Sequence, residues 1–584
     1  MLLTSRRNRP GTALAIGITL TLLLAGSAQA ATIQVNSSAD PTDGSNCTLR
    51  QAIANAENDA QTNASCAAGT GDDTITFADS LFGQTITLDG NELLIDPGAH
   101  IGTLTIQGPG AAGLEVSGND LSRVFHISFN AVQTANQVTI HGLKISHGAV
   151  ANANGGGILN QGSLILDRDL VSGNTANGSS TGGTTNQVTT FGGGIDNTGG
   201  ALSVSFTQIT GNSVSSTASG GSTSNTATAR GAGNHAVGDI AGILNIDHSS
   251  IYNNAATAGA TGTGAQAIAE GGGVWSSAGA QDSIVSSTIA NNTLSATGTS
   301  EQETGGGVDT NITLGFAAFL SDDTVTGNVA STGANLAATA MGLKIRNTIV
   351  AEPSPAASNC SGITSLGHNL ADDNSCQPTG TGDQGNTEPG LLPLDNHGGS
   401  GPTRPPSIGS PAIDAGFSDF TTDQRDLTRP WEFINLPDDT SGNGADIGAV
   451  EIQGPFVAAT DPTSPSANSQ PNVIGGAEDG STIELHATSD CSDGPLGTGT
   501  VASFALPGIA PTNPLALGST TTFHAQSLYG TARSACSPTS VPYTVLAGPS
   551  SAPPPPTKKK KCKKGKGKKR AVSAKKKKCK KGKK

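Results

Sequence analysis

Large and aromatic side chains are scarce in this sequence. Aromatic residues make up 3% of its 584 positions, with 2 Trp, 3 Tyr and 2 Met, whereas Gly occurs 79 times. Hydrophobic residues of all kinds reach 35%. A thick globular core needs large apolar side chains, so this composition favours thin stacked layers of chain.

Helical periodicity is nearly absent between residues 155 and 330, where Gly, Thr, Ser and Asn dominate. These residues form helices poorly, because they cost backbone entropy or compete for backbone hydrogen bonds. Short stretches such as 163–166 and 202–206 instead alternate apolar and polar side chains. That alternation predicts short, half-buried strands.

Basic residues are few over most of the chain. Of 32 Lys and Arg residues, 18 lie in residues 558–584 and 3 in the first ten. Residues 31–557 therefore carry 11 basic against 45 acidic residues, a net charge of −34. Such an acidic body argues against nucleic acid as a partner and is compatible with an extracellular setting.

Long apolar runs are also lacking, since the run at 13–25 is too short for a comfortable membrane span. It follows Arg6, Arg7 and Arg9 and precedes the small residues of a cleavage site at 28–30. Residues 1–30 are therefore predicted to be a secretory signal, and the protein to be exported. The eight cysteines lack metal-site spacing, and their local pairing fits an oxidising compartment.

What the chain has in abundance is one repeated pattern. Each copy opens on three glycines and an aliphatic residue, at 155–158, 192–195, 271–274 and 305–308, with a degenerate opening expected at 240–243. Each opening leads to a β-branched residue, two small or polar residues and an asparagine. The five asparagines are Asn174, Asn212, Asn254, Asn292 and Asn328. Self-similarity of this kind indicates a repeat architecture.

Strands this short must stack on neighbouring repeats to bury apolar surface. Glycine supplies positive φ at corners, and asparagines in one place on successive coils can hydrogen-bond to one another. We therefore expect an all-β fold with a right-handed parallel β-helix over residues 31–455, with 155–330 as repeats and the five asparagines structural. Inserts such as 175–190 would project from one corner; a disordered tract is the alternative.

The openings and asparagines resemble the polymorphic outer-membrane repeat, with its Gly-Gly-Ala-Ile and Phe-x-x-Asn halves. The match is loose, because Val or Ile replaces that Phe in every copy. The resemblance implies a bacterial surface protein.

Residues 31–70 predict a cap for the N-terminal end of the β-helix. Thr48 and Gln51 have the spacing of a capping box, and one helix face is apolar. That face consists of Leu49, Ala52, Ile53 and Ala56. A disulfide between Cys47 and Cys66 would close the cap over strand edges that otherwise aggregate. The segment resembles the Cys-Ser-Leu-Arg-Glu-Ala domain of bacterial surface proteins.

Residues 385–452 hold the most specific motifs. These are Leu391–Gly399, Gly409–Gly416, Asp423–Arg425, Arg429-Pro430 and Asp446–Glu451. In this order they look like the choice-of-anchor Q domain, although His397 and Asp426 depart from its pattern. The resemblance implies a β-helical surface protein and no common catalysis.

The charged residues of this segment suggest internal ion pairs. We expect Arg425 and Arg429 to pair with carboxylates such as Asp414 and Asp446, pinning the last coils. A Ca²⁺ site among Asp414, Asp423 and Asp446 is the alternative use of these carboxylates. No other cofactor is expected.

The remaining cysteines predict two more disulfides, Cys360–Cys376 and Cys491–Cys536. Residues 456–547 have the size and strand spacing of a bacterial immunoglobulin-like module, whose usual role is that of a spacer. A Pro-rich linker at 548–557 leads to the Lys-rich tail at 558–584. The tail, which contains Cys562 and Cys579, is expected to be disordered because its charges repel one another.

Candidate catalytic groups are weak. Asp72-Asp73, His147, Asp247-His248 and the pair Lys344 and Arg346 superficially match motifs of polysaccharide-degrading β-helices, but are better explained as strand or turn residues. Glycoside hydrolysis needs two carboxyl groups about 5 to 9.5 Å apart, whereas adjacent strand residues point to opposite faces.

Two hypotheses follow. The favoured one is an exported, monomeric cell-surface protein with a binding, adhesive or structural role. Its tail would hold it to anionic envelope polymers or lipids. The alternative is a secreted polysaccharide lyase or glycoside hydrolase of the pectin-lyase-like β-helix class, which would use acidic groove residues, with or without Ca²⁺.

Overall fold

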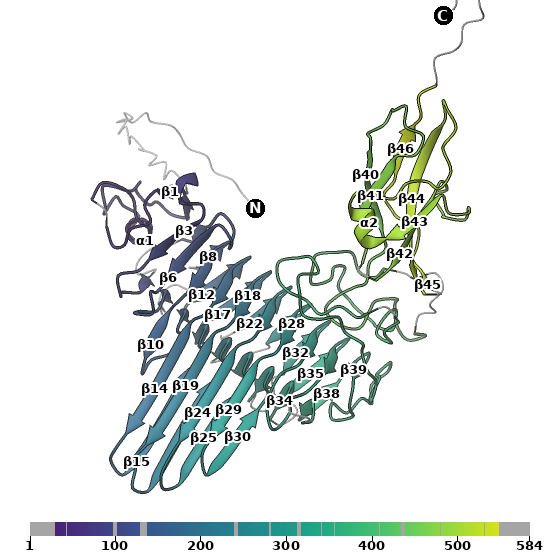
Figure 1. Cartoon of the computed structure of the whole chain (residues 1–584). Coiled ribbons are helices and arrows are strands. Elements are labelled where there is room, and N and C mark those ends of the chain that lie inside the picture. The colour runs from purple at the N-terminus through teal and green to yellow at the C-terminus, as the bar shows by residue number, and fades with distance from the viewer. Residues whose placement is uncertain are drawn as a thin grey trace, which may run out of the picture.

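The computed structural model describes residues 30–547, apart from 43, 97–101, 129–136, 239–242, 279–281, 312–316, 340–341, 355–356, 408, 432, 434–438, 479 and 531. The expected signal apart from its last residue, the whole Pro-rich linker and the Lys-rich tail lie outside the described residues. The described chain forms a long stack of parallel strands followed by a smaller antiparallel unit (Figure 1). The expected all-β fold, a parallel β-helix with a small sandwich, is confirmed.

Three parallel sheets make up the β-helix. Sheet I contains β1 (Thr32–Val35), β2 (Asp73–Phe77), β5 (Leu104–Gln107), β8 (Gln137–His141), β12 (Ser163–Asp167), β17 (Ala201–Ser205), β22 (Leu244–Asp247), β27 (Ser283–Val285), β32 (Ala318–Ser321), β35 (Leu343–Arg346) and β38 (Ile363–Ser365). Sheet II contains β3 (Gln84–Thr87), β6 (Leu114–Ser117), β9 (Lys144–Ser146), β13 (Leu170–Ser172), β18 (Gln208–Thr210), β23 (Ser250–Tyr252), β28 (Thr288–Ala290), β33 (Thr324–Thr326), β36 (Ile349–Ala351) and β39 (Leu370–Ala371). Sheet III contains β4 (Leu93–Ile95), β7 (Phe125–Ile127), β11 (Ile158–Asn160), β16 (Ile195–Thr198), β21 (Asn234–Gly238), β26 (Val274–Ala278), β31 (Val308–Thr310), β34 (Leu336–Ala338) and β37 (Cys360–Ser361).

The core of the β-helix is built from aliphatic ladders. In sheet I, for example, Leu166 lies in register between Ile140 and Val204, and all three are fully buried. Alternate residues of each strand point inward, which explains why the apolar–polar alternation predicted these strands. Burying one such side chain is worth about 1.5–3 kcal/mol, so the ladders hold successive coils together.

The repeat inserts form ordered strands in place of loops. One pair of sheets carries them: β10 (Ala149–Ala151), β14 (Thr175–Thr181), β19 (Ser213–Ser219), β24 (Ala255–Ala260) and β29 (Thr293–Thr297) in one, with β15 (Thr185–Phe191), β20 (Ser224–Arg230), β25 (Ala265–Glu270) and β30 (Ser300–Thr304) in the other. We call this two-layered extension the arm; it projects from the body in Figure 1. Its core is mostly alanine, exemplified by Ala227, Ala258 and Ala267. Such small side chains fit a thin layer between two sheets.

A short helix covers the first coil. Helix α1 (Leu49–Glu57) begins at a capping box formed by Thr48 and Gln51, as expected. Its four expected apolar residues are all buried, and the helix packs on β1, β2 and β4. A disulfide joins Cys47 to Cys66. A 3-10 helix, η1 (Asp79–Leu81), lies further along the first coils.

One expected opening was misplaced. Residues 239–242 lie outside the described residues, and Ile243 directly precedes β22 rather than opening a coil. The structure places the opening upstream, at Gly231-Ala232-Gly233-Asn234, where Asn234 pairs with Ile195 of the previous coil. The error arose because Asn234 stands where the other openings have an aliphatic residue.

The chain then folds back and leads into the sandwich. Residues 385–452, which we call the strap, lie against sheet II and contain no regular strand among their described residues. The sandwich contains β40 (Phe456–Asp461), β41 (Asn472–Gly476), β42 (Thr482–His486), β43 (Gly497–Thr500), α2 (Val501–Ala505), β44 (Thr520–Tyr529), β45 (Ala532–Arg533) and β46 (Val541–Thr544). Its named strands pair antiparallel, and its core includes Phe504, Phe523 and Tyr543. No helix in the described part of the chain is long and apolar enough to cross a membrane.

Candidate functional site

The five predicted asparagines lie in one hydrogen-bonded column. The Nδ2 of each donates to the Oδ1 of the next, over 2.9 Å from Asn254 to Asn292 and 3.0 Å from Asn292 to Asn328. Each Oδ1 from Asn212 onward also accepts the backbone N–H of the preceding asparagine. The column does not end at Asn328, because it continues through Asn335 and Asn359. All of these side chains are buried, so they hold coils together and are not exposed to a ligand.

The glycine openings fit against this column. The first glycine of the copy at 192–195 has a φ of +59°, which favours glycine. A Cβ on the third, Gly194, would lie 2.7 Å from the carbonyl oxygen of Gly233 on the next coil. It would also lie 3.0 Å from the side chain of Asn212. Glycine is therefore required for close approach of backbone and asparagine as well as for the turn.

A second polar column lies at the corner between sheets I and II, and sequence reasoning missed it. The backbone N–H of Thr207 donates to Ser249 Oγ, and that of Ser249 to Ser287 Oγ, both over 3.1 Å. The column ends on carboxylates, since Asp169 accepts from Leu143 N–H and Asp323 from Ser287 N–H. Burial raises the pKa of both carboxyls well above the usual range. Because this column is built from different residue types, the sequence shows no repeated residue that would reveal it.

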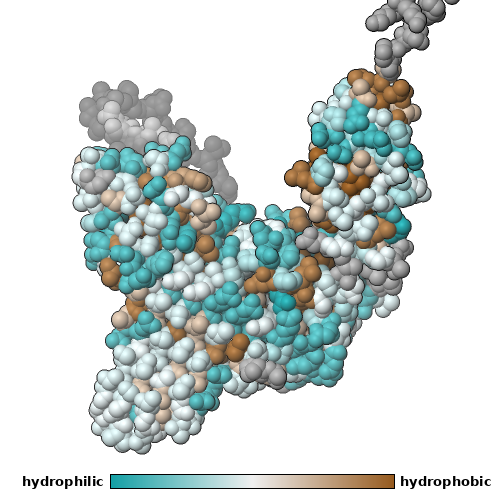
Figure 2. Space-filling view, viewed as in Figure 1, coloured by the Kyte–Doolittle hydropathy of each residue, from teal (hydrophilic) through white to brown (hydrophobic). Residues whose placement is uncertain are grey.

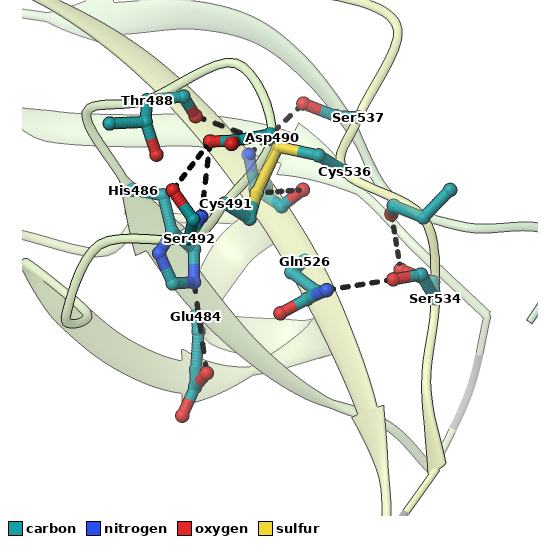
Figure 3. Close-up of a disulfide and its surroundings, with 12 residues drawn as sticks. Glu484, His486, Thr488, Asp490, Cys491, Ser492, Gln526, Ser534, Cys536 and Ser537 are labelled. Carbon is teal, nitrogen blue, oxygen red and sulfur yellow. Dashed lines mark hydrogen bonds and ion pairs between the residues drawn. A yellow bond between two sulfur atoms is a disulfide. The ribbon is translucent and has the colours of Figure 1, made fainter. Parts of the chain in front are cut away.

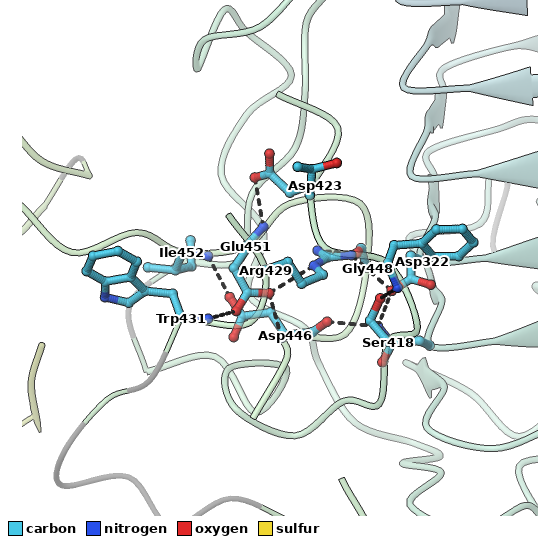
Figure 4. Close-up of polar contacts among 12 residues, drawn as sticks. Asp322, Ser418, Asp423, Arg429, Trp431, Asp446, Gly448, Glu451 and Ile452 are labelled. Carbon is cyan, nitrogen blue, oxygen red and sulfur yellow. Dashed lines mark hydrogen bonds and ion pairs between the residues drawn. The ribbon is translucent and has the colours of Figure 1, made fainter. Parts of the chain in front are cut away.

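Arg429 occupies the centre of a buried ionic cluster that joins the strap to the β-helix (Figure 4). Its Nη1 lies 3.0 Å from Asp322 Oδ1 at a coil corner, and its Nε lies 3.0 Å from Glu451 Oε2. Its Nη2 donates to the carbonyl oxygen of Gly448. All three charged side chains are fully buried. Arg429 therefore links two parts of the strap to the coil corner between β32 and β33, where Asp322 lies.

The ion pairs that the structure shows for the two arginines involve other carboxylates than the two expected ones. Arg425 pairs with Asp423 at 2.9 Å and with Glu478 of the sandwich at 2.8 Å, whereas Arg429 pairs with Asp322 and Glu451. Asp446 instead accepts the backbone N–H groups of Asp414 and Ile452, which fold the strap on itself. Asp322 belongs to a coil and Glu478 to the sandwich, so these two partners could not be identified by proximity in sequence.

The geometry does not support the alternative hypothesis of a Ca²⁺ site among Asp414, Asp423 and Asp446. Asp423 is engaged by Arg425, and burial raises the pKa of Asp446 well above its usual range, which disfavours a metal-binding carboxylate. Across the described residues, no group of three or more His, Cys, Asp or Glu side chains is placed to hold a metal ion.

The strap covers one row of outward-facing side chains on sheet II. Gln208, Ser250, Thr288 and Thr324 lie in register along that row. Gln208 Nε2 and Ser250 Oγ donate to the carbonyl oxygens of Ser400 and Pro402 in the strap, respectively. Thr288 Oγ1 donates to Gln424 Oε1, and Thr324 Oγ1 accepts the backbone N–H of Ala449. The face that an open β-helix would offer to a polymer is therefore closed along this row.

Beside the closed row, a cleft of about 470 Å³ remains between the coils and the strap. Its walls are Gln208, Tyr252, Asn253 and Asn291 from the coils and Leu394 to Asn396 and Gly399 to Pro402 from the strap. Tyr252 is half-buried, and its hydroxyl donates to Gln208 Oε1 over 3.0 Å. Asn253 and Asn291 occupy coil corners with positive φ, and both residues are exposed. The cleft thus combines one aromatic ring with several amides.

The candidate catalytic groups of the sequence are engaged elsewhere. Asp73 is buried and accepts the backbone N–H groups of Ala31 and Thr70, whereas Asp72 accepts from Thr103. His248 lies 2.5 Å from its neighbour Asp247. These contacts are structural.

The remaining candidates, which are the pair Lys344 and Arg346 and the single residue His147, make their contacts in different parts of the molecule. Arg346 pairs with Asp419 at 2.7 Å, and Lys344 lies over the ring of Phe319. His147 sits at a corner with a φ of +50°, 3.5 Å from Asp120. Neither group lines the cleft.

An aromatic stack fills the corner where the arm meets sheet III. The ring of His235 lies between Phe191 and Trp275, with ring-centroid distances of 4.0 and 4.8 Å. His235 Nδ1 is 2.6 Å from Asp196 Oδ1, and Arg230 lies over the Trp275 ring. Sequence reasoning missed this stack, because each coil contributes a single ring and the three rings belong to different residue types.

All three predicted disulfides of the described region are present. They are Cys47–Cys66, Cys360–Cys376 and Cys491–Cys536. Figure 3 shows the last of these within the sandwich, beside the polar turn that contains Asp490 and Ser492. Cys562 and Cys579 lie outside the described residues.

No protein-family model and no curated protein sequence matches this chain.

Proposed function

We propose that this protein is an exported, cell-surface β-helical protein that binds polysaccharide in the cleft beside Tyr252. The observation that carries the proposal is the lining of that cleft. Amide side chains both donate and accept hydrogen bonds, as sugar hydroxyls require, and an aromatic ring offers an apolar face to a sugar ring. Asn253 and Asn291 supply exposed amides, and Tyr252, whose hydroxyl is held by Gln208, supplies the ring.

Binding is favoured over the alternative, hydrolysis or lyase chemistry. Of the described residues that line the cleft, Asp395 alone carries a carboxylate. Its Oδ1 accepts the backbone N–H of Asn396, so it shapes the loop. Glycoside hydrolysis uses a pair of carboxyl groups in defined separation.

The resemblances support the cellular setting. The strap is similar to the choice-of-anchor Q domain, and the cap to the Cys-Ser-Leu-Arg-Glu-Ala domain, both of bacterial surface proteins. The Lys-rich tail would hold the protein to anionic envelope polymers or lipids, while the acidic body extends away from them.

Affinity electrophoresis through gels that contain neutral or acidic polysaccharides tests the proposal. We expect at least one polysaccharide to retard the wild-type protein, and Tyr252→Ala to lose most of that retardation. Gln266→Ala, on an exposed part of the arm, is the control and should behave like the wild type. Equal retardation of wild type and Tyr252→Ala would rule out the cleft. Release of reducing or unsaturated ends would favour the enzymatic alternative.

A further inference from the structure

The arm ends abruptly on its N-terminal side. Its first full strands are β14 and β15, and the preceding coil contributes only β10, which pairs with Thr175 to Asn177 of β14. Among the described strands, β15 pairs with β20 alone, so one long edge of β15 has no neighbouring strand there. In Figure 1 this end of the arm lies below the N-terminal coils.

The base of this edge is closed by the protein itself. The Oδ1 of Asn154 accepts the backbone N–H of Phe191 over 3.1 Å, and Gly155 N–H donates to Phe191 O. On β14, Asn152 Oδ1 accepts the backbone N–H of Ser179 over 2.8 Å. These asparagines satisfy the edge where it joins the body.

Further along, the edge of β15 is open. Backbone groups alternate in direction along a strand, and those of Phe191 point to the edge, so those of Thr185, Gln187 and Thr189 point there too. In the described structure, the backbone groups of these three residues have no partner on that side. Their side chains are exposed.

The opposite end of the arm is protected. Its last strand, β30, carries Glu301 and Glu303, and Thr332 N–H donates to Glu303 O. Charged side chains on an edge strand discourage pairing with other chains. Strand β15, with the sequence Thr-Asn-Gln-Val-Thr-Thr-Phe, has neither charge nor proline. The surface of the arm in Figure 2 is correspondingly pale, being neither strongly hydrophilic nor hydrophobic.

We propose that this edge, residues 185–189 of β15, pairs antiparallel with the same edge of a second copy of the chain. The spacing of the outward groups is self-complementary: Gln187 would face its own copy on a two-fold axis, and Thr185 would face Thr189. Cross-strand Thr pairs favour such pairing. The occupant is a second copy because one two-fold axis satisfies all three outward residues at once.

Charge also favours this arrangement. Antiparallel pairing sends the two arms in opposite directions, which keeps the acidic bodies roughly 20 Å or more apart along the strands. That separation exceeds the Debye length of about 8 Å at physiological salt, so repulsion between the bodies is screened. The paired edge is short and buries less than the roughly 1,000 Å² of a stable interface. The dimer is therefore weak and forms only at high local concentration.

Disulfide trapping in the full-length protein tests the pairing. Directly opposed residues in an antiparallel hydrogen-bonded pair have Cα atoms about 5.5 Å apart, which a disulfide spans. In a Cys562→Ser/Cys579→Ser background, we expect Gln187→Cys to give a covalent dimer on mild oxidation. Gln266→Cys, exposed on the same arm but on an interior strand, should stay monomeric. Equal trapping of both variants, or of neither, would overturn the proposal.

Sedimentation velocity over a concentration series provides an independent readout. The wild type should sediment faster as its concentration rises, and Thr189→Lys should not, because the added charge faces the partner strand. Gln266→Lys is the matched control and should associate like the wild type. Association that survives Thr189→Lys would place the interface elsewhere. Retention of an unrelated protein by the monomeric arm would show that the edge serves another partner.

Discussion

At the scale of single residues, the asparagine column is the clearest target. In Asn254→Ala, the backbone N–H of Asn212 and the carbonyl oxygen of Ile209 lose their partners in the buried corner. Each buried, unsatisfied group costs about 1–3 kcal/mol, so we expect a loss of about 3 kcal/mol in the free energy of unfolding. Because the column continues past Asn328, Asn328→Ala should cost a similar amount. Denaturant titration measures both.

The matched control is Asn253→Gly. Asn253 lies next to the column at a φ of +56°, which glycine adopts readily, and its side chain is outside the column. Its unfolding midpoint should change little. A large loss in this control, with little change in Asn254→Ala, would contradict the role given to the column.

Buried carboxyls at the arm corner predict a pH dependence. Burial, with Glu270 nearby, raises the pKa of Asp309 from 3.8 to about 8. The folded state thus keeps this proton to higher pH than the unfolded chain, so stability falls as pH rises between about 4 and 8. Asp309→Asn, which keeps an acceptor for Thr304 Oγ1, should be more stable than wild type at pH 8 and equal to it at pH 4.

Thermal unfolding of both proteins at the two pH values measures this difference. Glu301→Gln, an exposed carboxylate on the same arm, is the control and should follow the wild type at both. A constant difference between wild type and Asp309→Asn at all pH values would refute the assignment.

At the scale of elements, the cap helix protects the first strand edges. Replacing both Cys47 and Cys66 by Ser should loosen α1 from β1, β2 and β4 and expose those edges. We expect light scattering to rise below the temperature at which circular dichroism reports unfolding. The same exchange at Cys491 and Cys536 leaves the cap intact and should produce no such early aggregation. Simultaneous aggregation and unfolding in the first variant would contradict this account.

At the scale of the whole molecule, charge is divided between the acidic body and the Lys-rich tail. A cationic cluster near an anionic surface gains about 1 kcal/mol per Lys or Arg, and salt screens this attraction. We expect full-length protein to stay on cells at low salt and to be released by rising salt. A form that ends at Thr557 should wash off at low salt, as measured by immunoblotting. Equal retention of the two forms would disprove tail anchoring.

Much of the fold was encoded locally and could be predicted. The asparagines, the glycine openings, the capping box at Thr48 and the nearby cysteine pair all act between residues at fixed spacing or at equivalent places in repeats. Their physical roles, which are a hydrogen-bond column, a positive-φ turn and a helix start, are properties of the residue type and its position. Repetition itself therefore determined the parallel stack.

Only the tertiary structure decided which distant groups meet. Arg429 reaches Asp322, over a hundred residues earlier, because the strap folds back across the coils. The same return path leaves the cleft beside Tyr252 and closes the rest of the row. The inserts became a two-layered arm because alanines of successive copies pack together, and this left one edge of β15 open. These features depend on long-range packing, which no local spacing specifies, whereas the stack of coils follows from the repeated residues alone.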